Sequence, residues 1–130
     1  MFGQETSRLL LRKSPRADGV TISFEEFERV EIRIGTIVDA KEFTRARKPM
    51  YRLTIDFGPE VGMRESAAGL PARYSLDELA GKQVIAVLNL GPRNIAGFQS
   101  QCLTLGVPDA QRETVLLTPT REVPNGGLLF

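Results

Sequence analysis

The sequence predicts an all-β fold, a five-stranded Greek-key barrel with a short helix between its third and fourth strands. Apolar and polar residues alternate over 30–37 and again over 51–57, which is the period of strands that bury one face. The nearly all-apolar run 83–90 is typical of a central strand that is covered on both faces. A short helical segment precedes that run, and this order of elements suits one small barrel.

The N-terminal part is expected to lie outside the barrel. Residues 1–22 show neither helical nor strand periodicity and contain several basic residues, so we expect a flexible basic extension. Ser23 and Glu26 have the spacing of a capping box, which predicts a short helical turn. Phe24 and Phe27 lie on one side of that turn and need a surface to pack against.

The remaining residues, 23–130, are expected to form the barrel domain. The expected strands are 30–37, 51–57, 62–68, 83–90 and 101–105, with an added strand at 114–119. Gly35 allows a bulge that bends the first strand. Between the third and fourth strands, the segment 71–82 predicts a short helix with a capping box at Ser75 and Glu78. Three strands, a helix and two more strands match the OB-fold, in which the helix plugs the barrel.

Composition limits the function to binding. The chain has no His and one cysteine, Cys102, which sits in an apolar strand and is expected to be an inert core residue. The net charge is +1, and neither GxxxxGK[ST] nor GxGxxG occurs. The carboxylates lie mostly at predicted helix starts or on strand exteriors, where capping explains them. We therefore expect no enzyme, no metal and no cofactor, and a cytoplasmic protein without membrane insertion.

Several motifs in register resemble one known family. They read EIRIGTIVDA, ARKPMYRLTIDFG, ESAAGL, GKQVIAVLNLGPR, IAGFQSQCLTLG and VPNGG. Their order is similar to that of the tRNA-binding-domain family and most similar to its CsaA branch, described as a dimeric secretion chaperone. The resemblance implies an OB-fold, homodimerisation through the chain ends, no catalysis, and binding of tRNA or unfolded polypeptide. The family's Lys-His-Pro type stretch lacks its His here, because this chain reads TRARKPMY.

The resemblance also marks individual positions. Arg33, Asn89 and Arg93 fall on its motif, as do Gly97 and Ser100. Arg93 is thereby expected in the binding rim or the dimer seam, and a salt bridge to an acid distant in sequence is the competing interpretation.

OB-folds bind extended polymers across the face of strands two and three, which defines a candidate surface. Five basic residues cluster beside it and form an expected basic rim: Lys41, Arg45, Arg47, Lys48 and Arg52. Such a rim would meet phosphates, although an ordinary solvated loop explains it equally well. Phe98 is the candidate for stacking on bases, with a loop aromatic folded back onto the barrel as the alternative, whereas Tyr51 alternates with core residues and is expected to be buried.

A peptide ligand would need small residues and free hydrogen-bonding groups on the same face. Ser66, Ala68, Gly97 and Ser100 offer close approach, and Asn89 and Gln101 offer hydrogen bonds. Tight barrel turns would explain the same small residues. The expected binding face, for peptide or tRNA, therefore comprises Arg33, Ser66, Ala68, Asn89, Arg93, Gly97, Phe98, Ser100 and Gln101.

Apolar residues at both ends predict a homodimer. A lone barrel would leave them in water, and a two-fold interface would bury them. They are Phe24, Phe27, Leu128, Leu129 and Phe130. The sequence thus favours an export-related chaperone of the CsaA type that binds unfolded or pre-export polypeptides and retains tRNA as a competing ligand. The alternative is a free-standing tRNA-binding protein or a tRNA-binding subunit of a synthetase.

Overall fold

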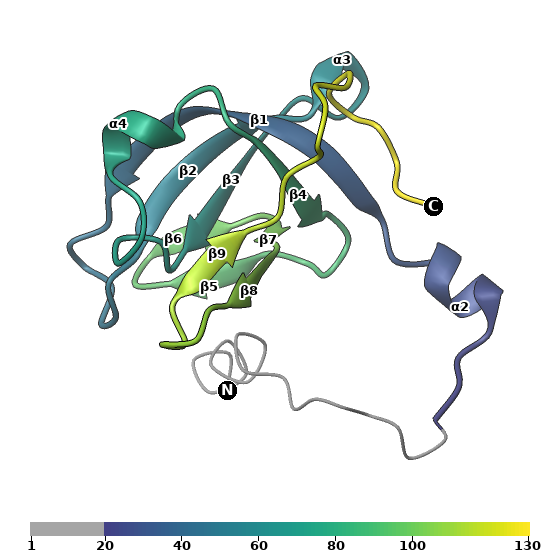
Figure 1. Cartoon of the computed structure of the whole chain (residues 1–130), viewed down its shortest axis with the longest axis horizontal. Coiled ribbons are helices and arrows are strands. Elements are labelled where there is room, and N and C mark those ends of the chain that lie inside the picture. Colours follow the sequence, from purple (N-terminus) through teal and green to yellow (C-terminus); the bar gives the residue numbers. More distant parts are fainter. Residues whose placement is uncertain (1–19) are drawn as a thin grey trace.

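The computed structural model describes residues 20–130, so most of the extension expected at residues 1–22 lies outside the described residues. Within them, an antiparallel sheet curls into a nearly closed barrel (Figure 1). Its strands are β1 (Ile32–Glu42), β2 (Tyr51–Asp56), β3 (Met63–Ala68), β4 (Gln83–Val87) and β7 (Leu103–Thr104). They lie in the order β3-β2-β1-β4-β7, which confirms the predicted OB-fold.

Short helices and hairpins surround this barrel. The helices are α2 (Phe24–Glu28), α3 (Gly58–Val61) and α4 (Leu76–Leu79). One hairpin pairs β5 (Arg93–Ile95) with β6 (Phe98–Ser100), and the other pairs β8 (Gly106–Pro108) with β9 (Thr114–Leu116). The sequence did not predict α3 or the β5–β6 hairpin. Across residues 20–130, every helix is too short or too polar to cross a membrane.

Strand β1 is long enough to serve both halves of the barrel. Its first part pairs with β4 and its second part with β2. The bulge is not at Gly35 as expected, because the register shifts between Ile37 and Asp39. Gly35 has a different role, since a Cβ there would lie 2.6 Å from the Ile55 side chain and 2.7 Å from that of Phe57. The glycine therefore lets the core pack closely against β1.

The core explains the position of α4. Leu79 is fully buried and packs into the main apolar cluster with Ile37 and Val84, so the helix plugs the barrel as predicted. The predicted capping box is present, because the Glu78 carboxylate accepts a hydrogen bond from the backbone N–H of Ser75 at 2.8 Å. That bond lowers the pKa of Glu78.

The barrel is sealed between β3 and β7 by polar contacts instead of a strand ladder. Ser100 Oγ accepts from the Ala67 backbone N–H at 3.0 Å, and Ser66 Oγ donates to the Cys102 carbonyl at 3.1 Å. Thr104 Oγ1 lies 2.9 Å from Ser66 Oγ. These hydroxyls satisfy backbone and side-chain groups that would otherwise be buried without partners.

The C-terminal residues extend the sheet beside β1. The backbone N–H of Ile34 donates to the Gly127 carbonyl, and Leu129 N–H donates to the Ile32 carbonyl. Gly126 has a φ of 93°, and a Cβ there would lie 2.6 Å from the Phe57 carbonyl oxygen. The motif VPNGG is therefore explained by the close passage of this segment over the barrel.

Candidate functional site

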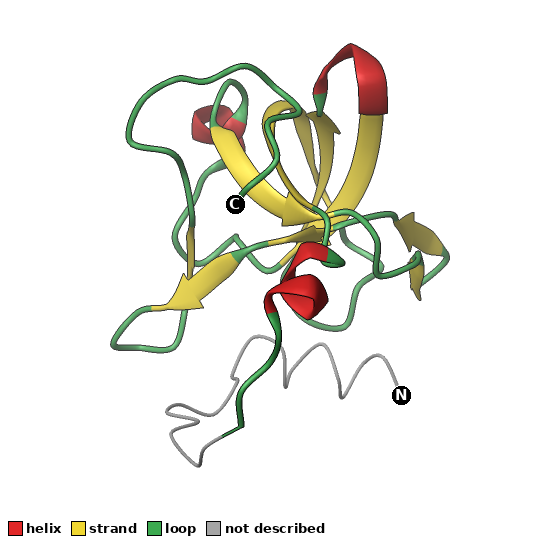
Figure 2. Cartoon of the chain, turned by 90° about the vertical axis from the view of Figure 1, so that its right-hand side faces the viewer, coloured by secondary structure: helices red, strands yellow, loops and turns green. Residues whose placement is uncertain are grey.

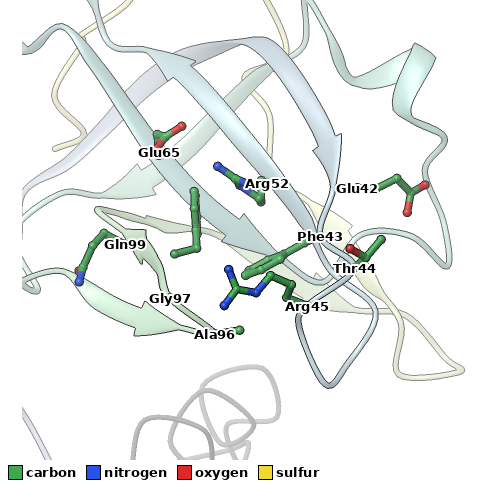
Figure 3. Close-up of a pocket in the computed structure, with 10 residues that line it drawn as sticks. Glu42, Phe43, Thr44, Arg45, Arg52, Glu65, Ala96, Gly97 and Gln99 are labelled. Carbon is green, nitrogen blue, oxygen red and sulfur yellow. The ribbon is translucent and has the colours of Figure 1, made fainter.

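A shallow pocket opens on the outer face of β2 and β3, which is the face expected to bind a ligand. The loop 43–50 borders it on one side and the tip of the β5–β6 hairpin on the other (Figure 3). Its volume is about 330 Å³. The residues that line it are Glu42, Phe43, Thr44, Arg45, Arg52, Glu65, Ala96, Gly97, Phe98 and Gln99. We call this surface the β2–β3 face.

Two aromatic rings form the floor of the pocket. Phe43 and Phe98 pack edge to face with their ring centroids 5.4 Å apart, and Ala67 completes this small cluster. Phe98 is only 7% exposed. The expectation of a solvent-exposed stacking ring at Phe98 was therefore wrong, and the alternative of a ring folded back onto the barrel holds.

Arg52 lies over these rings. Its guanidinium carbon is 4.5 Å from the Phe98 centroid and 6.0 Å from that of Phe43. Both distances are within the range of cation–π attraction. Arg52 is itself exposed, because it lies on the outward side of β2 between the buried residues Tyr51 and Leu53. The burial of Tyr51 was predicted, and its hydroxyl donates to the Tyr74 carbonyl.

The loop after β1 brings a second guanidinium, that of Arg45, beside the tip of the β5–β6 hairpin. Ala96 and Gly97 both have positive φ, as a two-residue type I′ turn requires. The Gly97 backbone N–H donates to Asn94 Oδ1 at 2.9 Å. The Arg45 guanidinium lies 3.6 Å from where a Gly97 Cβ would be, so the side chain rests against the hairpin tip (Figure 3).

The expected basic rim divides into two groups. Arg45 and Arg52 enter the pocket, and among residues 20–130 neither makes an ion pair. Lys41 lies 3.7 Å from the Asp39 carboxylate. Arg47 and Lys48 are exposed but do not line the pocket. Glu42 and Glu65 line it, so the site carries both signs of charge.

Several predicted ligand residues are structural within the chain. Ser66 and Ser100 are almost fully buried in the barrel seam, and Ala68 is buried in the main core. They cannot offer a groove of small residues to a peptide, so that part of the predicted binding face was wrong. The alternative was that small residues serve tight barrel turns, but these three lie in strands β3 and β6, where they pack in the barrel seam and the core.

Other predicted ligand residues hold segments together. Arg33 donates to the Glu31 carboxylate at 2.7 Å and to the Gly126 carbonyl at 2.8 Å, which ties the C-terminal segment to β1. Asn89 donates to the Arg29 carbonyl and accepts from the Glu31 N–H, so it fixes the entry into β1. These contacts use the polar groups that were expected to face a ligand.

Arg93 lies inside the protein. It begins β5, pairs with Ser100 and is 6% exposed. Burial lowers the pKa of its guanidinium, since a buried site disfavours the charged form. Burial likewise raises the pKa of Cys102 to about 11, which leaves the thiol protonated and unreactive at neutral pH. The expectation that Arg93 lies on an accessible rim is not met within this chain.

The residues predicted to form a dimer interface lie at one side of the molecule. Helix α2 stands outside the barrel, and every residue in it is exposed or half-buried (Figures 1 and 2). Phe24 is 65% exposed, Leu128 55% and Phe130 fully exposed, whereas Phe27 and Leu129 are half-buried. Val30 and Leu90 are also exposed apolar residues, and the sequence did not single them out for this role.

An OB-fold barrel with two exposed arginines in one pocket on its β2–β3 face, one of them over aromatic rings, has the features of a polymer-binding domain. The chain belongs to the tRNA-binding-domain family, because the family model described as a putative tRNA-binding domain matches residues 32–127. This match confirms the family resemblance predicted from the motifs.

Solved structures and longer relatives agree with this assignment. The chaperone CsaA from Bacillus anthracis str. Ames is 46% identical, with a TM-score of 0.79 over 85% of this chain and 100% of that one. The CsaA chaperone protein from Picrophilus torridus is 37% identical with a TM-score of 0.78 over the same shares. A methionine–tRNA ligase from Pyrococcus furiosus is 34% identical over 96% of this chain. The chain spans only 18% of that ligase.

Proposed function

We propose that the chain is a non-enzymatic RNA-binding protein that takes tRNA on its β2–β3 face. The observation that carries the proposal is the pair Arg45 and Arg52, which line one pocket and make no ion pair within residues 20–130, with Arg52 lying over two aromatic rings. Unpaired guanidinium groups attract phosphates, and the flat guanidinium itself can stack on an unstacked base. The family description supports tRNA as the ligand.

A second candidate is the chaperone function predicted from the sequence, with unfolded or pre-export polypeptides as ligands. The specific observation in its favour is the likeness to two proteins named as CsaA chaperones, each covered over its whole length. The buried positions of Ser66, Ala68 and Ser100 count against the peptide groove first expected. A polypeptide would instead have to use exposed apolar residues elsewhere on the surface.

We also propose a homodimer in the cytoplasm, assembled through the exposed apolar residues of α2 and the C-terminal segment. Burying side chains such as Phe24, Leu128 and Phe130 in a two-fold interface would remove apolar area from water. The dimer would present two β2–β3 faces to one long ligand and raise its avidity.

The test compares two ligands at two salt concentrations. We expect bulk tRNA to bind wild-type protein and the affinity to fall steeply with salt, because phosphate contacts release counterions. The double variant R45Q/R52Q should bind at least about tenfold more weakly, whereas the control Arg121→Gln removes an exposed charge outside the pocket and should bind like wild type. Tight, salt-insensitive binding of an unfolded polypeptide without tRNA binding would favour the chaperone candidate instead.

Sedimentation velocity tests the dimer. We expect a dimer at micromolar concentration that Phe24→Asp converts to monomer, because the charge would be buried in the interface. Val107→Asp is the matched control, since Val107 is also exposed but lies on the β8 strand. A monomeric wild-type protein would refute this assembly.

A further inference from the structure

We propose that the guanidinium of Arg52 is the base-stacking platform of the β2–β3 face and receives one unpaired nucleobase of an RNA ligand. The inference rests on the proposed RNA-binding function and adds to it the group that holds a base. It also replaces the aromatic ring that the sequence suggested. The proposal follows from three properties of the Arg52 site: layering, lack of an ion pair, and acidic neighbours.

The layering puts Arg52 between the rings and the solvent. Phe98 and Phe43 are both buried, so neither ring has a face available to a ligand. The Arg52 guanidinium lies 4.5 Å from the Phe98 centroid and is exposed. A base that enters the pocket therefore meets the guanidinium group before it meets either ring. Arginine planes stack on bases as aromatic rings do, because the group is flat, delocalised and weakly hydrated.

The orientation of Arg52 comes from the rings and not from a carboxylate. Within the described part of the chain Arg52 forms no salt bridge, although Glu42 and Glu65 line the same pocket. A bidentate carboxylate would satisfy the edge of the guanidinium. Contact with two rings instead restrains the guanidinium group, and its N–H groups have no carboxylate partner among the described residues. A restrained side chain loses less entropy when it binds.

The acidic neighbours favour a base over a lone phosphate at this point. Carboxylates of Glu42 and Glu65 oppose an anion but accept hydrogen bonds from the N–H groups of a base edge. Arg45 lies at the hairpin tip beside Gly97 and is free to follow a phosphate (Figure 3). The two arginines thus have different roles: Arg45 meets the backbone of the ligand, and Arg52 stacks on its base.

Charge-conserving substitutions separate stacking from electrostatics. The probe is a short single-stranded oligoribonucleotide with one 2-aminopurine, whose fluorescence falls when the base is stacked. Arg52→Lys keeps the charge and removes the plane, so we expect about tenfold weaker binding, an unchanged salt dependence and loss of quenching. Arg45→Lys should weaken binding less than R52K does and keep the quenching, because a point charge still attracts phosphate. The control Arg121→Lys lies outside the pocket and should bind and quench like wild type.

Phe98→Leu tests the support beneath the platform. This variant keeps Arg52 but removes the ring that orients it, and we expect reduced quenching in protein whose circular dichroism and cooperative melting show that it is folded. If the F98L variant does not fold, the comparison of R52K with wild type decides the question. Arg52 is exposed, so replacing it does not open a cavity in the core.

The outcomes separate the two proposals. If wild-type protein binds neither bulk tRNA nor the oligoribonucleotide, the proposed RNA-binding function fails. If both bind with the expected salt dependence but R52K binds and quenches like wild type, the stacking role of Arg52 is overturned while RNA binding stands. The stacking role would also be overturned if R52K no longer bound an unfolded polypeptide but still bound RNA like wild type.

Discussion

Gln101 and Glu65 form a two-way bridge across the barrel seam. The Gln101 backbone N–H donates to the Glu65 carbonyl at 2.7 Å, and the Gln101 side-chain oxygen accepts from the Glu65 N–H at 2.8 Å. The side chain thus takes the place of a backbone carbonyl at the edge of β3. Gln101 was expected on the ligand-binding face, and this bridge gives it a structural role.

The bridge predicts that Gln101→Ala lowers the free energy of unfolding by about 0.5–1.5 kcal/mol, because one hydrogen bond at a partly solvated edge is lost. Gln101→Glu keeps an acceptor oxygen in the same place and should stay close to wild type. Urea unfolding measures both. Unchanged stability together with weaker tRNA binding in Q101A would restore the ligand-binding interpretation.

The backbone conformation of Ala96 predicts that a substitution at this position will stabilise the protein. It has a φ of 49° at the first central position of the β5–β6 turn, a conformation that costs alanine about 1 kcal/mol. Ala96→Asn should raise the free energy of unfolding by about 0.5–1 kcal/mol, since Asn-Gly is the preferred type I′ pair. Ala96→Val should lower it, because a β-branched residue tolerates this backbone least. The reverse ranking in urea unfolding would contradict the turn assignment.

Alanine substitutions at Gly126 and Gly91 distinguish the cost of backbone strain from the cost of steric crowding. Both have positive φ, but a Cβ at Gly126 would lie 2.6 Å from the Phe57 carbonyl oxygen, whereas a Cβ at Gly91 would meet no atom within 4 Å. We expect Gly91→Ala to cost about 1 kcal/mol and Gly126→Ala about 2–4 kcal/mol, since the second adds overpacking to strain. Equal losses of stability in thermal unfolding would mean that the C-terminal segment moves away from the Phe57 carbonyl at no cost.

The Arg73–Asp109 pair predicts a loss of stability in acid. Arg73 Nε lies 2.7 Å from Asp109 Oδ2, and this hydrogen bond is the main reason that the pKa of Asp109 is lowered from 3.8. A carboxyl group whose pKa is lower in the folded state adds stability at pH values above 3.8, and the stability is lost as the pH falls through the folded pKa.

Asp109→Asn measures this contribution, because asparagine still accepts the turn hydrogen bonds from Gln111 and Glu113 that Asp109 Oδ1 accepts. The difference in unfolding free energy between wild type and D109N should be constant near neutral pH and shrink as the pH falls below 3.8. Salt should reduce it, since both side chains are partly exposed. A difference that grows in acid would refute the assignment.

Local pattern predicted most of the barrel. Strands β2 and β3 and the capping boxes at Ser23 and Ser75 lie where periodicity and helix-start signals put them, because those signals act over a few residues. The β5–β6 hairpin was missed. Its three-residue strands are too short to show alternation, and their Gly and Asn residues indicated only a turn.

The sequence by itself determined the fold class, the family and the face on which a ligand is expected, since these depend on residue types in register along the chain. Only the tertiary structure decided which side chains on that face are accessible. Phe98 and Ser100 were expected to meet a ligand, but contacts with Phe43 and Ala67, both distant in the sequence, bury them. Burial depends on neighbours that no local pattern encodes, and it left Arg45 and Arg52 as the exposed cations of the pocket.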